Sequence, residues 1–317
     1  MTYRPSVKAT VIASVSGGKD STAMMLHLRE LEIPFRPVFF DTGWEHAETY
    51  AHVDYLEQAI GVTIERRGHA VDLPDDLLAD AVAIEAAMGH NRPSAFVRLC
   101  LKKGIYPRRT VRFCTQILKV FVAQEAIREM HAGDLFPVNA VGIRAAESAA
   151  RAGLDETELS TTLDCLVWRP ILRWTETDVV EVHRRHGVSM NPLYARGAER
   201  VGCWPCIMGS KAELRLLARD KQRVAAIRML EEAVRQHHTA RVESRGEVVG
   251  RLPTLFTAAR RDAAGDRPGI LIDEALAWAR TRRGGAVEQE WLFEQDPEDP
   301  SAGCLRWGMC EHPAGAA

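Results

Sequence analysis

Short apolar runs alternate with amphipathic stretches along the first two thirds of this 317-residue chain. The apolar runs predict β-strands over residues 9–15, 35–40, 62–65, 136–143 and 163–170. Apolar positions at helical spacing lie between these runs and predict helices over residues 22–28, 46–60, 115–131 and 178–186. Thr175 and Asp178 predict a capping box that opens the last of these helices.

Strands that alternate with helices favour a mostly parallel sheet. We therefore predict an α/β fold with helices on both faces of that sheet. Ligands of such sheets bind at the carboxyl ends of the strands. Glycine or polar residues follow three of the predicted strands, at Ser16, at residues 41–43 and at residues 142–144. We expect the functional site where these strand ends meet.

The chain changes character after about residue 210. Residues 211–236 predict a charged helix, residues 242–249 a hairpin around Gly246, and residues 271–283 a further helix. The segment from Glu288 onward is acidic and contains proline and cysteine. We therefore predict one domain over residues 1–210 and a smaller, mainly helical region with a cysteine-containing tail over residues 211–317.

The sequence Ser16-Gly-Gly-Lys-Asp-Ser21 stands between the first predicted strand and the first predicted helix. Its glycines let the backbone come close to an anion, and the positive end of the new helix points toward that anion. Lys19 adds a mobile positive charge, and the two serines add hydroxyl donors. The spacing differs from that of the Walker loop and of the Gly-x-Gly-x-x-Gly turn. The segment therefore predicts a phosphate-binding loop of another kind.

Composition and charge narrow the class of protein. Hydrophobic residues make up 46% of the chain, but no apolar run approaches the roughly 18 residues of a membrane span. The N-terminal apolar run is short and ends in the phosphate loop, so we predict no signal peptide. The net charge of −2 means that any contact with nucleic acid would be local. Seven cysteines at this length favour ligands or reactive thiols in a soluble, cytoplasmic protein.

The phosphate loop resembles the PP-loop of the ATP pyrophosphatase superfamily, whose members cleave ATP between its α and β phosphates. Other segments resemble the PAPS-reductase-like family of that superfamily, which includes sulfonucleotide (APS and PAPS) reductases, the ATP sulfurylase small subunit and thiolation enzymes. These segments are Asp41-Thr-Gly43, residues 142–151, residues 174–179, Asn191-Pro-Leu-Tyr194 and Cys203-Trp-Pro-Cys206. The resemblance covers roughly residues 10–210 in the family's motif order, and it implies the adenine nucleotide alpha hydrolase-like fold.

The resemblance implies that an adenine nucleotide binds at the loop. The implied nucleotide-binding residues are Ser16, Gly17, Gly18, Lys19, Asp20, Ser21, Asp41, Gly142 and Arg144. The reductases usually carry a degenerate loop, whereas the intact loop here resembles that of members that bind and cleave ATP. Lys19 would then hold the departing pyrophosphate as a catalytic residue. Asp20 would help to position Mg²⁺, or would act only as a charge at the helix N-terminus.

The cysteines favour a metal centre. Cys203 and Cys206 share a tight turn that can aim two sulfurs at one metal. Cys114, followed five residues later by Lys119, resembles the segment that supplies ligands in cluster-bearing APS reductases, although Thr115 replaces their second cysteine. The resemblance therefore favours a [4Fe–4S] cluster over a structural zinc or a simple pair of thiols.

Three other cysteines compete for the place of fourth ligand: Cys100, Cys304 and Cys310. We predict Cys100, because it lies in the same segment as Cys114. Cys310 is then the candidate catalytic thiol of a mobile tail, beside His312, although the order differs from that of the reductase tail. Cys165 lies in an apolar run and is predicted to be a small core residue.

Residues 98–119 contain no acidic residue, and their basic residues are Arg98, Lys102, Lys103, Arg108, Arg109, Arg112 and Lys119. Such a segment could bind sulfate, phosphate or a nucleic-acid backbone, or could form a solvated basic face. We predict that the anionic substrate contacts Arg109, Arg112, Lys119 and Arg151.

Three functions fit these observations. The first is an enzyme that adenylates an acceptor with ATP and Mg²⁺ and then transfers sulfur to it, as in family members that thiolate tRNA or modify DNA. The second is a reductase that converts APS or PAPS to sulfite with a tail thiolate. The third is a non-catalytic nucleotide or nucleic-acid binding module. The expected partners are an adenine nucleotide, a sulfur donor or thioredoxin-like reductant, and a nucleic acid as a candidate acceptor, with no membrane.

Overall fold

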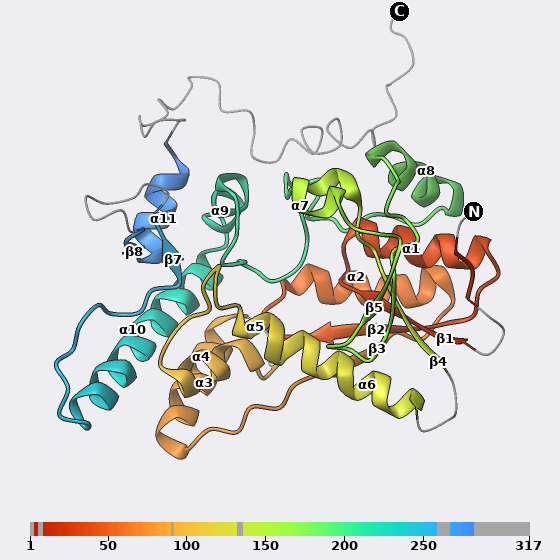
Figure 1. Ribbon diagram of the computed structural model, residues 1–317. Coiled ribbons are helices and arrows are strands. Elements are labelled where there is room, and N and C mark those ends of the chain that lie inside the picture. Colours follow the sequence, from red (N-terminus) through yellow and green to blue (C-terminus); the bar gives the residue numbers. More distant parts are fainter. Residues whose placement is uncertain (1–2, 6–8, 90–91, 132–135, 259–266, 282–317) are drawn as a thin grey trace, which may run out of the picture.

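The computed structural model describes residues 3–5, 9–89, 92–131, 136–258 and 267–281 (Figure 1). A six-stranded sheet, with the strand order β3-β2-β1-β4-β6-β5, forms the centre of one lobe. Its strands are β1 (Ala9–Val15), β2 (Phe35–Asp41), β3 (Glu65–Gly68), β4 (Phe136–Val141), β5 (Thr157–Ser160) and β6 (Cys165–Trp168). Neighbouring strands are parallel except β5 and β6, which pair antiparallel. This confirms the predicted α/β class.

Helices cover both faces of the sheet. Val11, Ala13 and Val15 of β1 belong to an apolar cluster with helices α1 (Lys19–Glu30), α2 (Ala47–Ile60) and α8 (Glu176–His186). Ile12 points to the opposite face and packs in a separate cluster with α6 (Phe121–His131). This alternation follows from the two-residue period of a strand and makes both faces of β1 apolar.

A second lobe consists mainly of helices (Figure 1). Its helices are α3 (Asp75–Ala87), α4 (Ala95–Lys103), α5 (Phe113–Thr115), α9 (Lys211–Leu217), α10 (Lys221–Glu243) and α11 (Ile272–Ala279). The small strands β7 (Phe256–Thr257) and β8 (Gly269–Ile270) pair beside them. Ile84, Phe96, Ile227 and Ile272 share one buried apolar cluster, so residues on both sides of position 210 contribute to it. The domain boundary at residue 210 stays a prediction.

Three short elements complete the part of the chain that the structure describes. A π-helical turn (Gln116–Val120) connects α5 to α6, and a 3₁₀ turn (Ala145–Glu147) and α7 (Ala149–Ala152) follow β4. Across the described residues, every helix is too short or too polar to span a bilayer.

The region after residue 210 differs from its sequence prediction. The predicted hairpin at residues 242–249 is wrong, because α10 continues to Glu243 and the chain then turns around Gly246. The predicted single helix is two helices that separate after Leu217. Asp220 accepts a hydrogen bond from the Arg223 amide and starts α10 as its N-cap, which explains the break.

Glu231 is a carboxyl group buried between α10 and α11. It is 4% exposed and accepts hydrogen bonds from the Ile272 amide at 3.0 and 3.1 Å. Burial raises the pKa of Glu231 to about 7. Folding therefore favours the protonated form of this side chain.

We expect Glu231→Gln to flatten part of the pH dependence of stability. A raised folded-state pKa contributes stability that is fully present below the unfolded pKa and is lost as pH rises through about 7. Glutamine keeps an acceptor for Ile272 without the charge, so the variant should gain on the order of 3 kcal/mol over the parent between pH 4.5 and pH 8. Urea unfolding at several pH values measures this, with the exposed Glu232→Gln as control. Parallel stability curves for parent and variant would contradict the assignment.

Candidate functional site

The chain leaves β1 in a tight turn over residues 16–18, and α1 begins at Lys19. Gly17 has a φ of +71°, and a Cβ at this position would lie 2.8 Å from Thr49 Cγ2. Position 17 therefore requires glycine, both for its positive φ and because there is no room for a side chain. The Ser21 hydroxyl accepts a hydrogen bond from the Ser16 amide at 3.2 Å and donates one to the Gly18 carbonyl at 2.9 Å. These bonds fix the loop at the positive end of α1.

Buried polar side chains from distant segments hold this loop in place. Asn191 donates from Nδ2 to the Gly17 carbonyl at 3.2 Å, and Tyr194 Oη accepts a hydrogen bond from the Lys19 amide at 3.2 Å. His183 Nε2 lies 3.0 Å from the Lys19 carbonyl. The segment Asn191–Tyr194 therefore closes over the loop.

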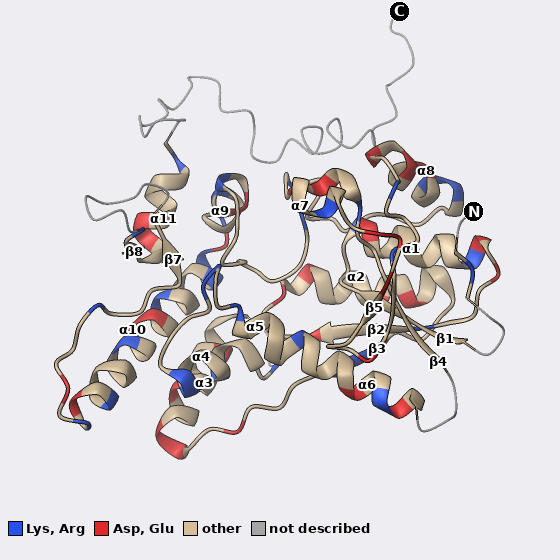
Figure 2. Ribbon diagram, viewed as in Figure 1, with Lys and Arg blue, Asp and Glu red and all other residues tan. Residues whose placement is uncertain are grey.

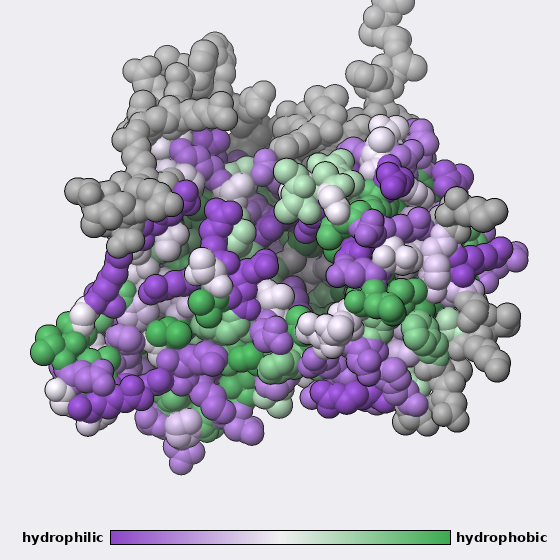
Figure 3. Space-filling view, in the orientation of Figure 1, coloured by the Kyte–Doolittle hydropathy of each residue, from purple (hydrophilic) through white to green (hydrophobic). Residues whose placement is uncertain are grey.

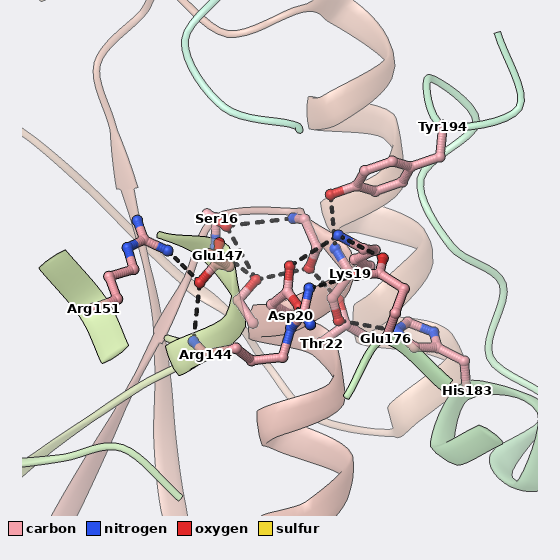
Figure 4. A network of polar contacts seen from close by, with 12 residues as sticks. Ser16, Lys19, Asp20, Thr22, Arg144, Glu147, Arg151, Glu176, His183 and Tyr194 are labelled. Carbon is pink, nitrogen blue, oxygen red and sulfur yellow. Dashed lines mark hydrogen bonds and ion pairs between the residues drawn. The ribbon is translucent and has the colours of Figure 1, made fainter. Parts of the chain in front are cut away.

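Two cations and two carboxylates form one network at the loop (Figure 4). Arg144 donates from Nε to Asp20 at 2.5 Å and from Nη2 to Glu176 at 2.7 Å. Lys19 Nζ lies 3.2 Å from Asp20 and 3.3 Å from Glu176. Burial alone would lower the pKa of Arg144, but Asp20 and Glu176 raise it. Each cation thus contacts both carboxylates.

A cavity of about 680 Å³ opens at this network. Leu172 and Trp174 give it an apolar wall. Its charged lining residues are Lys19, Arg144, Arg173, Arg200, Asp20, Glu147, Glu176 and Glu199. The formal charges of these described residues cancel, so a polyanion can bind strongly only if it displaces a carboxylate from the cations.

The carboxyl end of β2 connects the loop region to the cysteine turn. Asp41 Oδ1 accepts hydrogen bonds from the Gly43 amide and from Tyr50 Oη, both at 2.8 Å. Glu45 forms an isolated antiparallel bridge with Cys203, and the Trp204 amide donates to the Trp44 carbonyl at 2.8 Å. The Asp41 corner and the cysteine turn are therefore one unit.

Glu45 and Lys119 interact electrostatically within that unit. Glu45 is 2% exposed and accepts hydrogen bonds from Thr42 Oγ1 at 2.7 Å and from Tyr50 Oη at 3.0 Å. Burial raises the pKa of Glu45, and the charge of Lys119 opposes this shift. The pKa of Lys119 is raised chiefly by Cys203 and also by Glu45. Lys119 thus interacts electrostatically with both Glu45 and the cysteines.

The structure brings four of the predicted metal ligands into one region, which we call the cysteine group: Cys100, Cys114, Cys203 and Cys206. Cys114 interacts electrostatically with Cys100, Cys203 and Cys206. Burial raises the pKa of Cys203 to about 11. Among the described residues, no three His, Cys, Asp or Glu side chains are arranged to hold a metal ion. The iron–sulfur and magnesium sites therefore stay predictions.

Two more cysteine predictions concern other places. Cys165 is buried in the cluster under α6, as predicted for a core residue. Cys304 and Cys310 lie outside the described residues.

The predicted anion-binding residues do not come together. Arg151 pairs with Glu147 beside the cavity (Figure 4), and Lys119 lies with the cysteine group. Arg109 and Arg112 are exposed on the loop between α4 and α5, and neither lines the cavity around Lys19.

Sequence reasoning missed two residues of the site. Glu176 forms ion pairs with both Lys19 and Arg144, but in the sequence it stands inside the Thr175–Asp178 capping box. Arg200 lines the cavity, donates to Glu213 at 3.1 Å and interacts electrostatically with Cys206. Its position three residues before Cys203 was the available signal. Arg200 shows that the cysteine group adjoins the cavity.

Residues 10–208 match the family model of the phosphoadenosine phosphosulfate reductase domain. The chain belongs to this family. It is 34% identical over 346 aligned positions to an uncharacterized 37.8 kDa protein of Escherichia phage 186, and the match covers 95% of this chain and 96% of that protein. This PAPS-reductase-like domain is thus part of the PP-loop superfamily, as the motifs predict.

Named relatives in the family are more distant. The adenosine 5'-phosphosulfate reductase of Burkholderia cepacia is 28% identical over 174 residues, which cover 55% of this chain and 60% of that reductase. A crystal structure of the phosphoadenylyl-sulfate reductase of Candida auris, in a phosphate complex, covers 62% of this chain and 82% of its own, with 18% identity and a TM-score of 0.43.

We expect Glu176→Gln to strengthen anion binding. The substitution keeps the size of the side chain and removes the charge that competes for Lys19 and Arg144. The affinity for pyrophosphate should rise by roughly three- to tenfold, corresponding to about 1 kcal/mol. Isothermal titration calorimetry measures this. Glu181→Gln, on the exposed side of the same helix, is the control, and an unchanged affinity in Glu176→Gln would show that the carboxylate does not compete.

Proposed function

We propose that this protein is an enzyme that binds ATP at residues 16–21, adenylates an acceptor and transfers sulfur to it. The intact phosphate loop carries the proposal. Lys19 and Arg144 converge on the cavity at the positive end of α1, which is the arrangement that a departing pyrophosphate requires. An adenine nucleotide as the ligand is supported by the name of the Burkholderia cepacia relative, whose substrate is a phosphosulfate of adenosine.

The chemistry proceeds in two displacements. An acceptor oxygen attacks the α-phosphorus of ATP, the bond from this phosphorus to the oxygen that bridges it to the β-phosphate breaks, and pyrophosphate leaves with that oxygen. Hydrosulfide then attacks the atom that bears the adenylated oxygen. A bond to sulfur forms, AMP leaves with the oxygen, and the proton of the hydrosulfide passes to solvent. Neither step oxidises or reduces a reactant.

The charges of the site assign roles to its residues. Lys19 and Arg144 exchange the Glu176 carboxylate for phosphate oxygens and so offset the charge of the leaving group. Asp20 already bonds both cations, and no magnesium site built by three side chains is present among the described residues. The residues do not fit such a site, and we derive no step through Mg²⁺.

The cysteine group has the donor atoms of a [4Fe–4S] cluster, because four thiolates are the usual ligands of that cluster. Within the described residues these side chains are not arranged around one metal, so a cluster would require them to move closer together. When bound, the cluster would supply an electrostatic and electron-transfer centre beside the cavity. Lys119 would offset the negative charge of the thiolates, and Glu45 would hold Lys119 in position. Arg200 would connect this centre to the bound nucleotide.

Reduction of a sulfonucleotide is the second candidate, favoured by the names of the relatives and by Arg200 between the cavity and Cys206. A cysteine thiolate, with Cys310 as the predicted group, attacks the sulfur of the nucleotide. A sulfur–sulfur bond forms and the sulfur–oxygen bond to the phosphate breaks. A dithiol of the thioredoxin class then displaces sulfite and becomes a disulfide, so its two electrons account for the reduction.

Lys19→Ala tests the nucleotide site. Loss of a charge-assisted contact of about 1.5–3 kcal/mol should lower ATP affinity roughly ten- to a hundredfold. Calorimetry with ATP measures the affinity, and the exposed Lys221→Ala serves as the control. ATP affinity equal to that of the parent would remove the basis of the proposal.

Product analysis of the unsubstituted protein separates the two candidates. We expect pyrophosphate when ATP, an acceptor and hydrosulfide are supplied. Sulfite formed from APS or PAPS with thioredoxin, without pyrophosphate from ATP, would establish the reductase instead.

Iron content tests the cysteine group. Anaerobically purified protein should hold about four irons per chain. Cys114→Ser, Cys203→Ser and Cys206→Ser should each lose the iron, as should Cys100→Ser, whereas Cys310→Ser and the core control Cys165→Ser should keep it. Metal analysis together with melting temperatures distinguishes ligand loss from unfolding. One zinc per chain without iron would assign the cysteines to a structural site.

A further inference from the structure

Three exposed arginines lie on the loop of residues 104–112 between α4 and α5, which we call the Arg108 loop (Figure 2). Within the part of the chain that the structure describes, the side chains of Arg108, Arg109 and Arg112 form no ion pair. Many arginines elsewhere are paired with carboxylates: Arg36, Arg66, Arg67, Arg98, Arg144, Arg169, Arg185 and Arg228. The charge of the loop is therefore not neutralised by the described fold.

The Arg108 loop is held in one conformation. Tyr106 is 2% exposed and donates from Oη to the Leu230 carbonyl on α10 at 2.9 Å. The backbones of Arg108 and Val111 exchange two hydrogen bonds, each 3.1 Å long. An ordered loop presents its guanidinium groups with little further entropy loss on binding.

Positive charge continues from this loop along the end of α4. Lys103 Nζ lies 5.3 Å from the ring centroid of Phe113, directly after Arg112. Arg241 of α10 donates to the Lys103 carbonyl at 3.0 Å. Lys102, Lys103 and Arg241 line a cavity of about 490 Å³ whose described lining contains no acidic residue. The loop and these three residues form one surface, which we call the basic surface.

The basic surface adjoins the cysteine group. Arg112 is the N-cap residue of α5, which carries Cys114, and Cys100 stands on α4 two residues before Lys102. An anion bound on this surface would therefore lie beside the proposed sulfur chemistry. The nucleotide cavity contacts the same cysteine group through Arg200.

We infer that the basic surface binds the phosphate backbone of a nucleic acid and so identifies the acceptor class of the proposed sulfur transfer. The inference rests on the proposed function for the acceptor role, but the binding surface rests on its own charges. Guanidinium forks match phosphate oxygens in pairs, and phosphates recur along a strand at spacings that several separate cations can follow. On the face that carries α4 and α5, hydrophilic residues are interspersed with hydrophobic ones (Figure 3).

Another partner fits this surface less well. An acidic peptide offers carboxylates at less regular spacing, and the test below includes it.

Fluorescence anisotropy with labelled single-stranded DNA, duplex DNA and RNA of equal length tests the inference. Binding should weaken steeply with salt, because each neutralised phosphate releases counterions. The triple variant Arg108→Ala/Arg109→Ala/Arg112→Ala should bind about tenfold or more weakly and should lower the logarithmic salt slope by roughly 2–3. The matched control is Arg128→Ala/Arg219→Ala/Arg251→Ala, which removes three other exposed arginines and should retain both affinity and slope. Melting temperatures confirm that both variants fold.

Three results would overturn the inference: no binding by the unsubstituted protein, equal losses in both triple variants, or equally tight binding of polyglutamate. Calorimetry of the unsubstituted protein with ATP distinguishes this failure from failure of the proposed function. ATP binding without nucleic-acid binding overturns the inference alone. Nucleic-acid binding without ATP binding overturns the proposed function and supports the basic surface.

Discussion

The pairing of Glu45 with Cys203 holds together the parts of the molecule that the candidate site needs. It fixes the cysteine turn to the carboxyl end of β2, and Trp44 Nε1 strengthens the joint by donating to the Pro205 carbonyl at 3.0 Å. Arg223 of α10 donates to the Glu45 carbonyl at 2.7 Å and lies 4.6 Å from the Trp44 ring centroid. Burial lowers the pKa of Arg223 to about 10. Keeping this guanidinium charged inside the protein therefore has a desolvation cost. Sheet, cysteine turn and helical lobe therefore meet at one point.

Buried cations are also paired with carboxylates at the nucleotide cavity, where a bound phosphate could replace one of these carboxylates. Lys19 is 5% exposed and Arg144 is 3% exposed, so neither could keep its charge at low cost without Asp20 and Glu176. A carboxylate that satisfies a cation in the empty protein must yield to a phosphate in the bound one. Glu176 is the more exposed of the two acids and can leave toward solvent, whereas Asp20 is fixed at the start of α1. The proposed site would therefore favour ligands with at least as much negative charge as the carboxylate they displace.

Local patterns were enough to predict β1, β2, β4 and β6, the turn before α1 and the capping box at Thr175, because neighbouring residues determine each of them. The short strand β5 was not predicted, and β3 lies at Glu65–Gly68 rather than at residues 62–65. The sequence also indicated Cys100 as a neighbour of Cys114, and the structure brings the two together. Glu176 and Arg200 could not be predicted in the same way, since their importance comes from contacts across more than 30 residues or with a turn placed by the fold. The false hairpin at residues 242–249 has a similar cause: Gly246 suggested a turn, but nothing local showed that α10 packs far enough to reach it.

The nucleotide cavity and the basic surface both adjoin the cysteine group, and this arrangement bears on how the two anionic reactants would meet. Arg200 lines the nucleotide cavity and interacts with Cys206. Arg112 of the basic surface is the N-cap residue of α5, the helix that carries Cys114. Two anions bound beside the cysteine group would repel each other in water, but each would have its own arginines, and Lys119 adds a positive charge at the cysteines. Activation of an acceptor by ATP requires that these two polyanions approach closely. In the proposed sulfur transfer, two separate sets of cations near the cysteine group would let both polyanions approach the sulfur atoms, and the Glu45–Cys203 pairing holds the cysteine turn in that place.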